Sequence, residues 1–109
     1  LRRMFYKIRL AGLALSADIL VFASAVQGAE AVGYLHDLEI KVPEEIEVMA
    51  VGKEDTALIC RPQLTTVEFD KKRFVRQAIE ELYVQMIKGY ILRKSGKISV
   101  KTIIRGSSN

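Results

Sequence analysis

DILVFA, at residues 18–23, and IEVMAV, at residues 46–51, are the two short apolar runs that decide the fold. Continuous runs of this kind are typical of strands in a parallel sheet that is covered on both faces. Between them, Ala29, Val32 and Leu35 recur at the spacing of one helix face. A strand, a helix and a second strand make one βαβ unit, whose parallel strands are joined by a right-handed crossover. The sequence therefore predicts an α/β fold with three layers around a parallel sheet.

The segments beside this unit predict further helices and loops. Apolar spacing predicts helices over Leu1–Leu13, ending near Gly12, and over Gln27–Asp37. Gly52–Gln63 has no clear period, which predicts a long loop or an edge segment. The polar tail Gly106–Asn109 predicts a loose chain end.

The last third of the chain predicts a long helix between two strands. The stretch Leu64–Val67 is short and β-prone. Asp70 is placed to accept a hydrogen bond from the first turn of a helix over Lys71–Lys88, and Gly89 is placed to end that helix. Ile98–Ile104 alternates between apolar and polar residues, as strands do.

Charge is distributed unevenly along the chain. The net charge is +4, and 28% of the residues are charged, which is typical of a globular protein. Seven acidic and two basic residues lie between His36 and Asp55, whereas ten basic and two acidic residues lie between Lys71 and Arg105. A basic segment can attract nucleic acid, but here no signature of basic residues interleaved with aromatic ones accompanies it. An ordinary solvated basic face is therefore the favoured interpretation.

Groups that could carry catalysis or hold a metal are sparse. His36 is the only histidine and Cys60 the only cysteine, and they lie on different predicted elements. Glu44, Glu45 and Glu47 are too close in sequence to face one another across a substrate. The sequence predicts no catalytic residue, no metal site and no cofactor, hence a protein that is not an enzyme. A single cysteine cannot form an intramolecular disulfide, which favours the cytoplasm.

The N-terminal segment also fits a second interpretation. Basic residues precede the apolar stretch Leu10–Ala25, which ends in Ala23-Ser24-Ala25, and this is the outline of a secretory signal. Asp18 inside the apolar stretch argues against it. No run reaches the roughly 20 apolar residues of a membrane span, so no membrane partner is expected.

Three stretches in a fixed order carry a resemblance to a known family. They are VPEEIEV at residues 42–48, RPQLTTV at residues 61–67 and IIRGSS at residues 103–108. With the spacing and the helix between them, they resemble the C-terminal part of the effector-binding domain of the lac/gal repressor family. The resemblance covers about residues 18–108.

The resemblance implies the C-terminal portion of a two-lobed periplasmic-binding-protein-like fold, with a ligand cleft between α/β lobes. On that pattern, residues 1–63 form the C-terminal lobe, residues 64–97 a crossover and a helix of the N-terminal lobe, and residues 98–109 the returning strand. The crossover residues are Leu64, Thr65, Thr66 and Val67.

The resemblance also implies the partners. Family dimers form through the helix after the first strand and the loop after the second. This pattern implies a homodimer, with an interface that includes Glu30, Tyr34, Leu38, Ile59 and Arg61. A small-molecule effector would change DNA affinity through the dimer, and operator DNA would be contacted through a segment outside this chain.

Effector-binding residues are implied after the first two strands, at Ser24, Ala25, Gly52, Lys53 and Asp55. The family carries Asn-Asp or Thr-Asp after the first strand and Gly-Phe-Asp-Asp after the second. This chain has Ser-Ala-Val and Ala-Val-Gly-Lys at the matching places. Because buried sugar hydroxyls are costly without such acidic partners, the sequence predicts an atypical effector or none.

Other function classes remain open at this point. A periplasmic sugar-binding fragment has the same fold but requires the secretory interpretation of the N-terminal segment. An interaction domain that has lost its ligand is favoured by the missing acids. An enzyme comes last, because no acid–base pair is visible.

Overall fold

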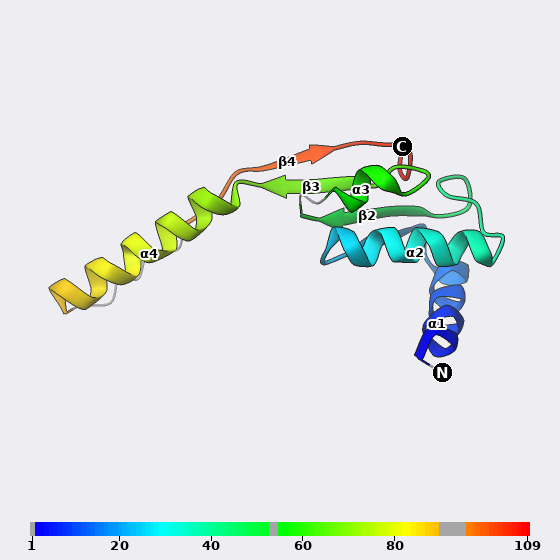
Figure 1. The fold of residues 1–109 in the computed structure, drawn as a ribbon, viewed down its shortest axis with the longest axis horizontal. Helices are drawn as coiled ribbons and strands as arrows, with labels where there is room; N and C mark the ends of the chain where they lie inside the picture. Colours follow the sequence, from blue (N-terminus) through cyan, green and yellow to red (C-terminus); the bar gives the residue numbers. More distant parts are fainter. Residues whose placement is uncertain (1, 53–54, 90–95) are drawn as a thin grey trace. The chain divides into compact units, whose positions relative to one another are not determined.

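The computed structural model describes residues 2–52, 55–89 and 96–109. The chain divides into two compact units, Leu1–Glu68 with Lys101–Asn109 and, separately, Phe69–Val100. In chain order the elements are α1 (Arg2–Ser16), β1 (Ile19–Phe22), α2 (Ala25–Asp37), β2 (Glu47–Val51), α3 (Thr56–Ile59), β3 (Thr65–Phe69), α4 (Lys71–Lys88) and β4 (Val100–Ile103) (Figure 1).

The four strands form one sheet in the order β1-β2-β3-β4. β1 pairs with β2 in parallel, with Leu20 opposite Val48, and β2 pairs with β3 in parallel, with Ala50 opposite Thr66. The arrows in Figure 1 show that β4 runs against β3. The prediction of an α/β fold built on a parallel sheet is confirmed.

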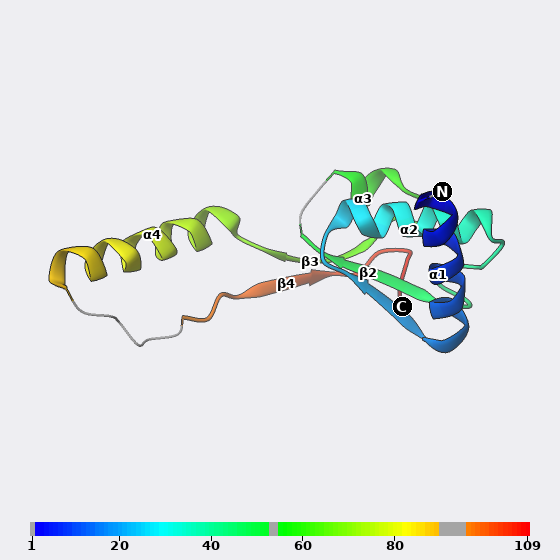
Figure 2. The same cartoon turned by 90° about the horizontal axis from the view of Figure 1, so that it is seen from below.

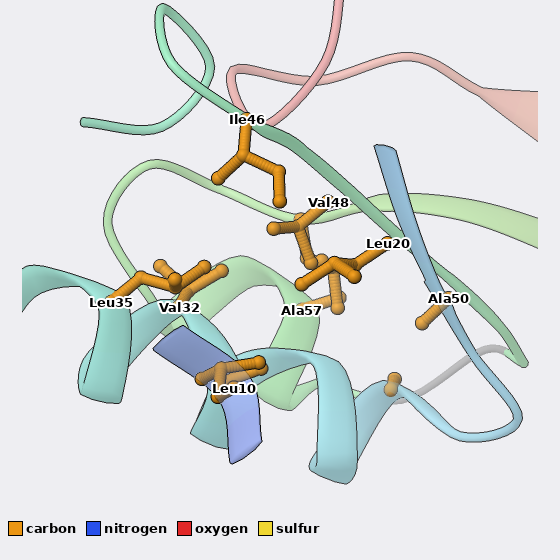
Figure 3. Packing of buried hydrophobic residues seen from close by; sticks show 11 residues of the cluster. Leu10, Leu20, Val32, Leu35, Ile46, Val48, Ala50 and Ala57 are labelled. Carbon is orange, nitrogen blue, oxygen red and sulfur yellow. The ribbon is translucent and has the colours of Figure 1, made fainter. Parts of the chain in front are cut away.

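Helices α2 and α3 cover one face of the sheet. They lie on the same side of β2 and β3 in Figure 2, and α2 contacts β1, β2 and α3. Strand side chains alternate, so that Leu20, Val48 and Ala50 are buried under these helices. Figure 3 shows how Leu20 and Val48 gather with Val32 and Leu35 of α2 to form the core.

The other face of β1 is open among the described residues. Ile19 is 41% exposed and Val21 is 62% exposed. The apolar run DILVFA predicted cover on both faces, and the third layer is not formed by the described part of this chain. β1 therefore has one buried face and one exposed face, whereas its continuous apolar run had predicted that both faces are buried.

Three segments differ from their sequence-based predictions by more than two residues or in the kind of structure. α1 continues through Gly12 to Ser16, because one glycine costs a helix only about 1 kcal/mol. The Ser16 hydroxyl also donates to the carbonyls of Gly12 and Leu13 at the helix end, both at 3.2 Å. Residues Thr56–Ile59, expected to be loop, form the helix α3, which is too short to show a period in sequence.

The third correction concerns the C-terminal tail, which is not loose. Ser107 is fully buried and Ser108 is 8% exposed. The Ser107 hydroxyl accepts from the Thr65 amide at 2.8 Å and donates to the Val48 carbonyl. Two backbone bonds of 2.9 Å, from the Ser107 amide to the Gln63 carbonyl and from the Val48 amide to the Ser107 carbonyl, complete the attachment. The tail is thus fastened to both β2 and β3.

The second unit contains α4, whose ends agree with the prediction. The Asp70 carboxylate accepts from the Arg73 amide at 3.1 Å, and Gly89 ends the helix with a φ of 67°. The rings of Phe69 and Phe74 meet edge to face at 6.0 Å, which is the hydrophobic contact that often fixes the start of a helix. No residue of α4 is buried in the described structure.

Candidate functional site

The carboxyl ends of β1 and β2 place the segments that follow them at one edge of the sheet. The register pairs Phe22 with Ala50, so Ser24 and Gly52 both lie two residues beyond a matched pair. In open α/β sheets, ligands bind outside the carboxyl ends of the strands. This edge is therefore the candidate effector site.

Ser24 and Gly52 have structural tasks at that edge. The Ser24 hydroxyl accepts from the Gln27 amide at 3.2 Å and so caps α2, which leaves its own proton free to be donated. Gly52 is buried, has a φ of 123°, and donates its amide to the Val67 carbonyl at 2.9 Å. A side chain would be strained at this φ, which is why glycine suits this position.

The remaining expected effector residues differ in their exposure to solvent. Ala25 is fully buried, so its side chain packs in the core. Asp55 is exposed, and its carboxylate makes no capping bond to α3. Lys53 lies outside the described residues. The described part of this edge thus offers the Ser24 hydroxyl and the exposed Asp55 carboxylate.

The residues expected at a dimer interface lie on α2, on α3 and just after them. Glu30 is exposed, Leu38 forms the C-cap of α2, and Ile59 at the end of α3 is 73% exposed. Arg61 is exposed, but one guanidinium nitrogen donates to the carbonyls of Leu58, Ile59 and Cys60 at 2.8, 3.4 and 3.0 Å. That side chain therefore closes the end of α3.

Tyr34 is engaged by α1, a contact that the sequence analysis missed. Its ring lies 5.2 Å from the ring of Tyr6 and 5.3 Å from the Lys7 ammonium, which also pairs with Asp37 at 3.3 Å. Burial, with a smaller effect of Glu30, raises the pKa of Tyr6. Tyr34 is half-buried as a result, and α1 and α2 pack as a pair.

Three of the four residues expected at the crossover are fully buried. Leu64, Thr65 and Thr66 are inaccessible to solvent, and Val67 is half-buried. Arg105 was missed by the sequence analysis as a partner of these residues. Its amide donates to the Thr65 hydroxyl at 2.9 Å. The only sequence signal for a role of Arg105 was its place within the stretch IIRGSS. Hydrophobic periodicity gives no information on a hydrogen bond between residues so far apart in the chain.

A hollow of about 710 Å³ opens at the far end of α2. It is lined by the last turn of α2, by residues 39–42 and 44, and by Arg61 and Pro62. Thirteen helical residues, spanning roughly 20 Å, separate this end from the cap at Ser24. The hollow is therefore distinct from the sheet edge, and acidic and basic side chains both line it.

No hydrogen bond joins the side chains of His36 and Cys60, the two residues with catalytic chemistry, in the described structure. His36 is exposed near the end of α2. Burial raises the pKa of the Cys60 thiol, whose sulfur lies within hydrogen-bonding distance of the Ala57 and Pro62 carbonyls at 3.6 and 3.4 Å. A protonated thiol is a poor nucleophile. Within residues 2–52, 55–89 and 96–109, no cluster of metal-binding side chains is found.

No helix in the described part of the chain has the length and apolar character needed to cross a membrane.

Comparison with known proteins identifies the fold. A family model of periplasmic binding protein-like domains matches residues 9–108. The cellobiose complex of the transcriptional regulator CelR is 20% identical, with a TM-score of 0.76 over 93% of this chain and 31% of its own. A LacI-family transcriptional regulator from Bifidobacterium animalis subsp. lactis is 16% identical, with a TM-score of 0.75 over 94% of this chain and 38% of its own.

A PurR-family transcriptional regulator from Vibrio parahaemolyticus is 27% identical, with a TM-score of 0.69 over 93% of this chain and 37% of its own. No curated protein matches the chain. The chain spans about a third of the length of these solved regulators. The chain therefore belongs to the family of periplasmic binding protein-like domains, and its fold is that of about a third of a LacI-family transcriptional regulator.

Proposed function

We propose that this chain is the effector-binding and dimerisation part of a bacterial transcription regulator of the lac/gal repressor type, acting in the cytoplasm. The observation that carries the proposal is the family match over residues 9–108, which includes the whole parallel part of the sheet. The solved proteins of similar fold described above are regulators by name. We infer that the chain has no catalytic role.

The two units support a division into lobes. We assign residues 1–63 to the C-terminal lobe, residues 64–97 to the crossover and a helix of the N-terminal lobe, and residues 98–109 to the returning strand. The first compact unit ends at Glu68 and resumes at Lys101, close to these limits. α4 exposes large apolar side chains, including Ile79 and Met86 at 61% and 73%, as expected of a helix that belongs to a larger core.

We place the effector at the carboxyl edge of β1 and β2. Ser24 would donate its free hydroxyl proton, Asp55 would accept, and Gly52, with its positive φ, would set the turn that follows β2. Lys53 follows Gly52 in sequence, and Ala25 supports the site from the core. CelR was solved with cellobiose, but the described residues of this edge offer few acceptors for sugar hydroxyls. The effector is therefore a small molecule other than a common sugar, or it has been lost.

Isothermal titration calorimetry of the intact protein with glucose, cellobiose and adenine tests the effector assignment. We expect dissociation constants weaker than about 1 mM, because the described residues of the edge cannot replace the water bound to the sugar hydroxyls or to the ring nitrogens and amino group of adenine. For a ligand found by screening, Asp55→Asn and Ser24→Ala should weaken binding at least tenfold. Asp18→Asn is the matched control, because Asp18 precedes β1 at the opposite edge. Micromolar binding of glucose, cellobiose or adenine would overturn the atypical-effector assignment.

We propose that a second copy of the chain binds the surface formed by α2 and α3. Glu30, Tyr34 and Leu38 belong to this surface on α2, and Ile59 and Arg61 belong to it at α3. Two further exposed apolar residues on these helices, Val26 at 50% and Leu58 at 46%, add to it. Burying Ile59 would contribute roughly 2 kcal/mol to association.

Analytical ultracentrifugation tests the dimer. Ile59→Asp should raise the dimer dissociation constant about 30-fold or more, because a carboxylate would be buried without a partner. Ile8→Asp is the control, since Ile8 is 61% exposed on α1 and outside the surface. A monomeric wild-type chain at high concentration, or an equal loss in the two variants, would count against this interface.

A further inference from the structure

The chain leaves the first unit after Glu68 and returns to it at Lys101, and a polar cluster joins the two segments at that place. One guanidinium nitrogen of Arg105 donates to the Leu64 carbonyl at 2.7 Å and to the Thr66 hydroxyl at 2.9 Å. The other lies 3.7 Å from the Glu68 carboxylate. Thr66 donates in turn to the same carboxylate oxygen at 3.0 Å. The three side chains therefore form a closed triangle of contacts.

The cluster is shielded from water. The side chains of Arg105 and Glu68 are only 15% and 14% exposed, and Thr66 is fully buried. Removing one member of a shielded ion pair leaves the other charge without compensation, which costs more than the loss of an exposed pair. The Arg105 backbone is also held, because its amide donates to the Thr65 hydroxyl at 2.9 Å. The outgoing and returning segments are thus bound through side chains as well as through strand pairing.

We infer that Thr66, Glu68 and Arg105 form a latch that fastens the outgoing segment, β3, to the returning segment, residues 100–105, which begins with β4. With the latch closed, the two segments bend as one two-stranded ribbon. With the latch open, each becomes a separate linker that is free to change its own φ and ψ angles, which is what a hinge requires. The latch therefore controls how readily β4 separates from β3, and it does so without any change in the core beneath β1 and β2.

Hydrogen exchange measured by NMR on the full chain tests the latch. Arg105→Met should speed exchange of the β4 amides, Val100–Ile103, and of the residue 105 amide about tenfold or more. Amides of Val48 and Ala50 in β2 should change less than threefold. Glu68→Gln retains an oxygen acceptor but removes the charge, and it should give an intermediate increase. Arg9→Met is the matched control, because Arg9 is exposed on α1 and no hydrogen bond of its side chain is seen among the described residues.

Two outcomes would overturn the inference. Unchanged β4 exchange in Arg105→Met would mean that strand pairing alone holds the segments. An equal increase in β2 and β4 would mean that Arg105 supports global stability and not a local device. If Arg105→Met fails to fold, the exchange rates of the β4 and β2 amides can be compared in Thr66→Val and Glu68→Gln. Each of these variants removes fewer contacts than Arg105→Met and should therefore remain folded.

Discussion

Replacing Ser107 with alanine should lower the free energy of unfolding by about 3 kcal/mol. The Ser107 hydroxyl accepts from the Thr65 amide and donates to the Val48 carbonyl, and all three residues are fully buried. Alanine leaves the Thr65 amide without a partner in a place that water does not reach, which costs the full desolvation of that group. One small side chain therefore joins the chain end to β2 and β3.

Urea denaturation followed by far-ultraviolet circular dichroism measures the effect. Ser99→Ala is the control, because Ser99 is exposed and no hydrogen bond of its side chain is seen among the described residues; it should change stability by less than about 0.5 kcal/mol. Threonine at position 107 retains the hydroxyl and should recover part of the loss. Equal stabilities of Ser107→Ala and Ser99→Ala would contradict this role for the C-terminal segment.

The error about this tail shows which features a sequence can predict. The start and end of α4 were correct, because Asp70 and Gly89 act on their own neighbouring residues. The strands β1 and β2 were correct for the same reason, since an apolar run is a local pattern. Ser107 instead finds its partners at Val48 and Thr65, 59 and 42 residues away. A polar tail gives no local sign of such bonds.

The place of Ser24 and Gly52 on the sheet was predictable, whereas the side chains that remain free near them were not. A parallel pair of strands requires Ser24 and Gly52 to follow at one edge, and the register confirms that geometry. Which side chains remain available could not be predicted, because that depends on packing. Ala25 turned inward as the first residue of α2, whereas Asp55 stayed exposed.

The latch residues also could not be predicted from local sequence patterns. Arg105 and Glu68 are ordinary charged residues in sequence, separated by a helix and a strand. They meet because β4 pairs beside β3, and their shielding follows from that pairing. Charge patterns along the chain predicted a solvated basic segment from Lys71 to Arg105. The last member of that segment is instead a partly buried partner of a carboxylate.

Replacing Gly28 with valine should lower the free energy of unfolding by about 3 kcal/mol. A Cβ atom at Gly28 would lie 2.9 Å from a methyl carbon of Leu64 and 3.1 Å from the Cβ of Ala50. Both neighbours are fully buried, so neither can move aside without disturbing the core. The absence of a side chain at Gly28 is what lets α2 approach β2 and the start of β3 closely. The two γ-methyl groups of valine would force the helix away from the sheet.

Gly33 on the same helix provides the matched control for Gly28. A Cβ atom at Gly33 would meet nothing within 4 Å, so Gly33→Val should leave stability within about 0.5 kcal/mol of wild type. Gly33→Ala should raise it by up to about 1 kcal/mol, because alanine favours the helix without strain. At position 28 that same propensity gain would offset part of the clash, so Gly28→Ala should be less destabilising than Gly28→Val. Urea denaturation separates these values. Equal stability of the two valine variants would mean that the sheet yields to α2, and that close packing at Gly28 does not limit the fold.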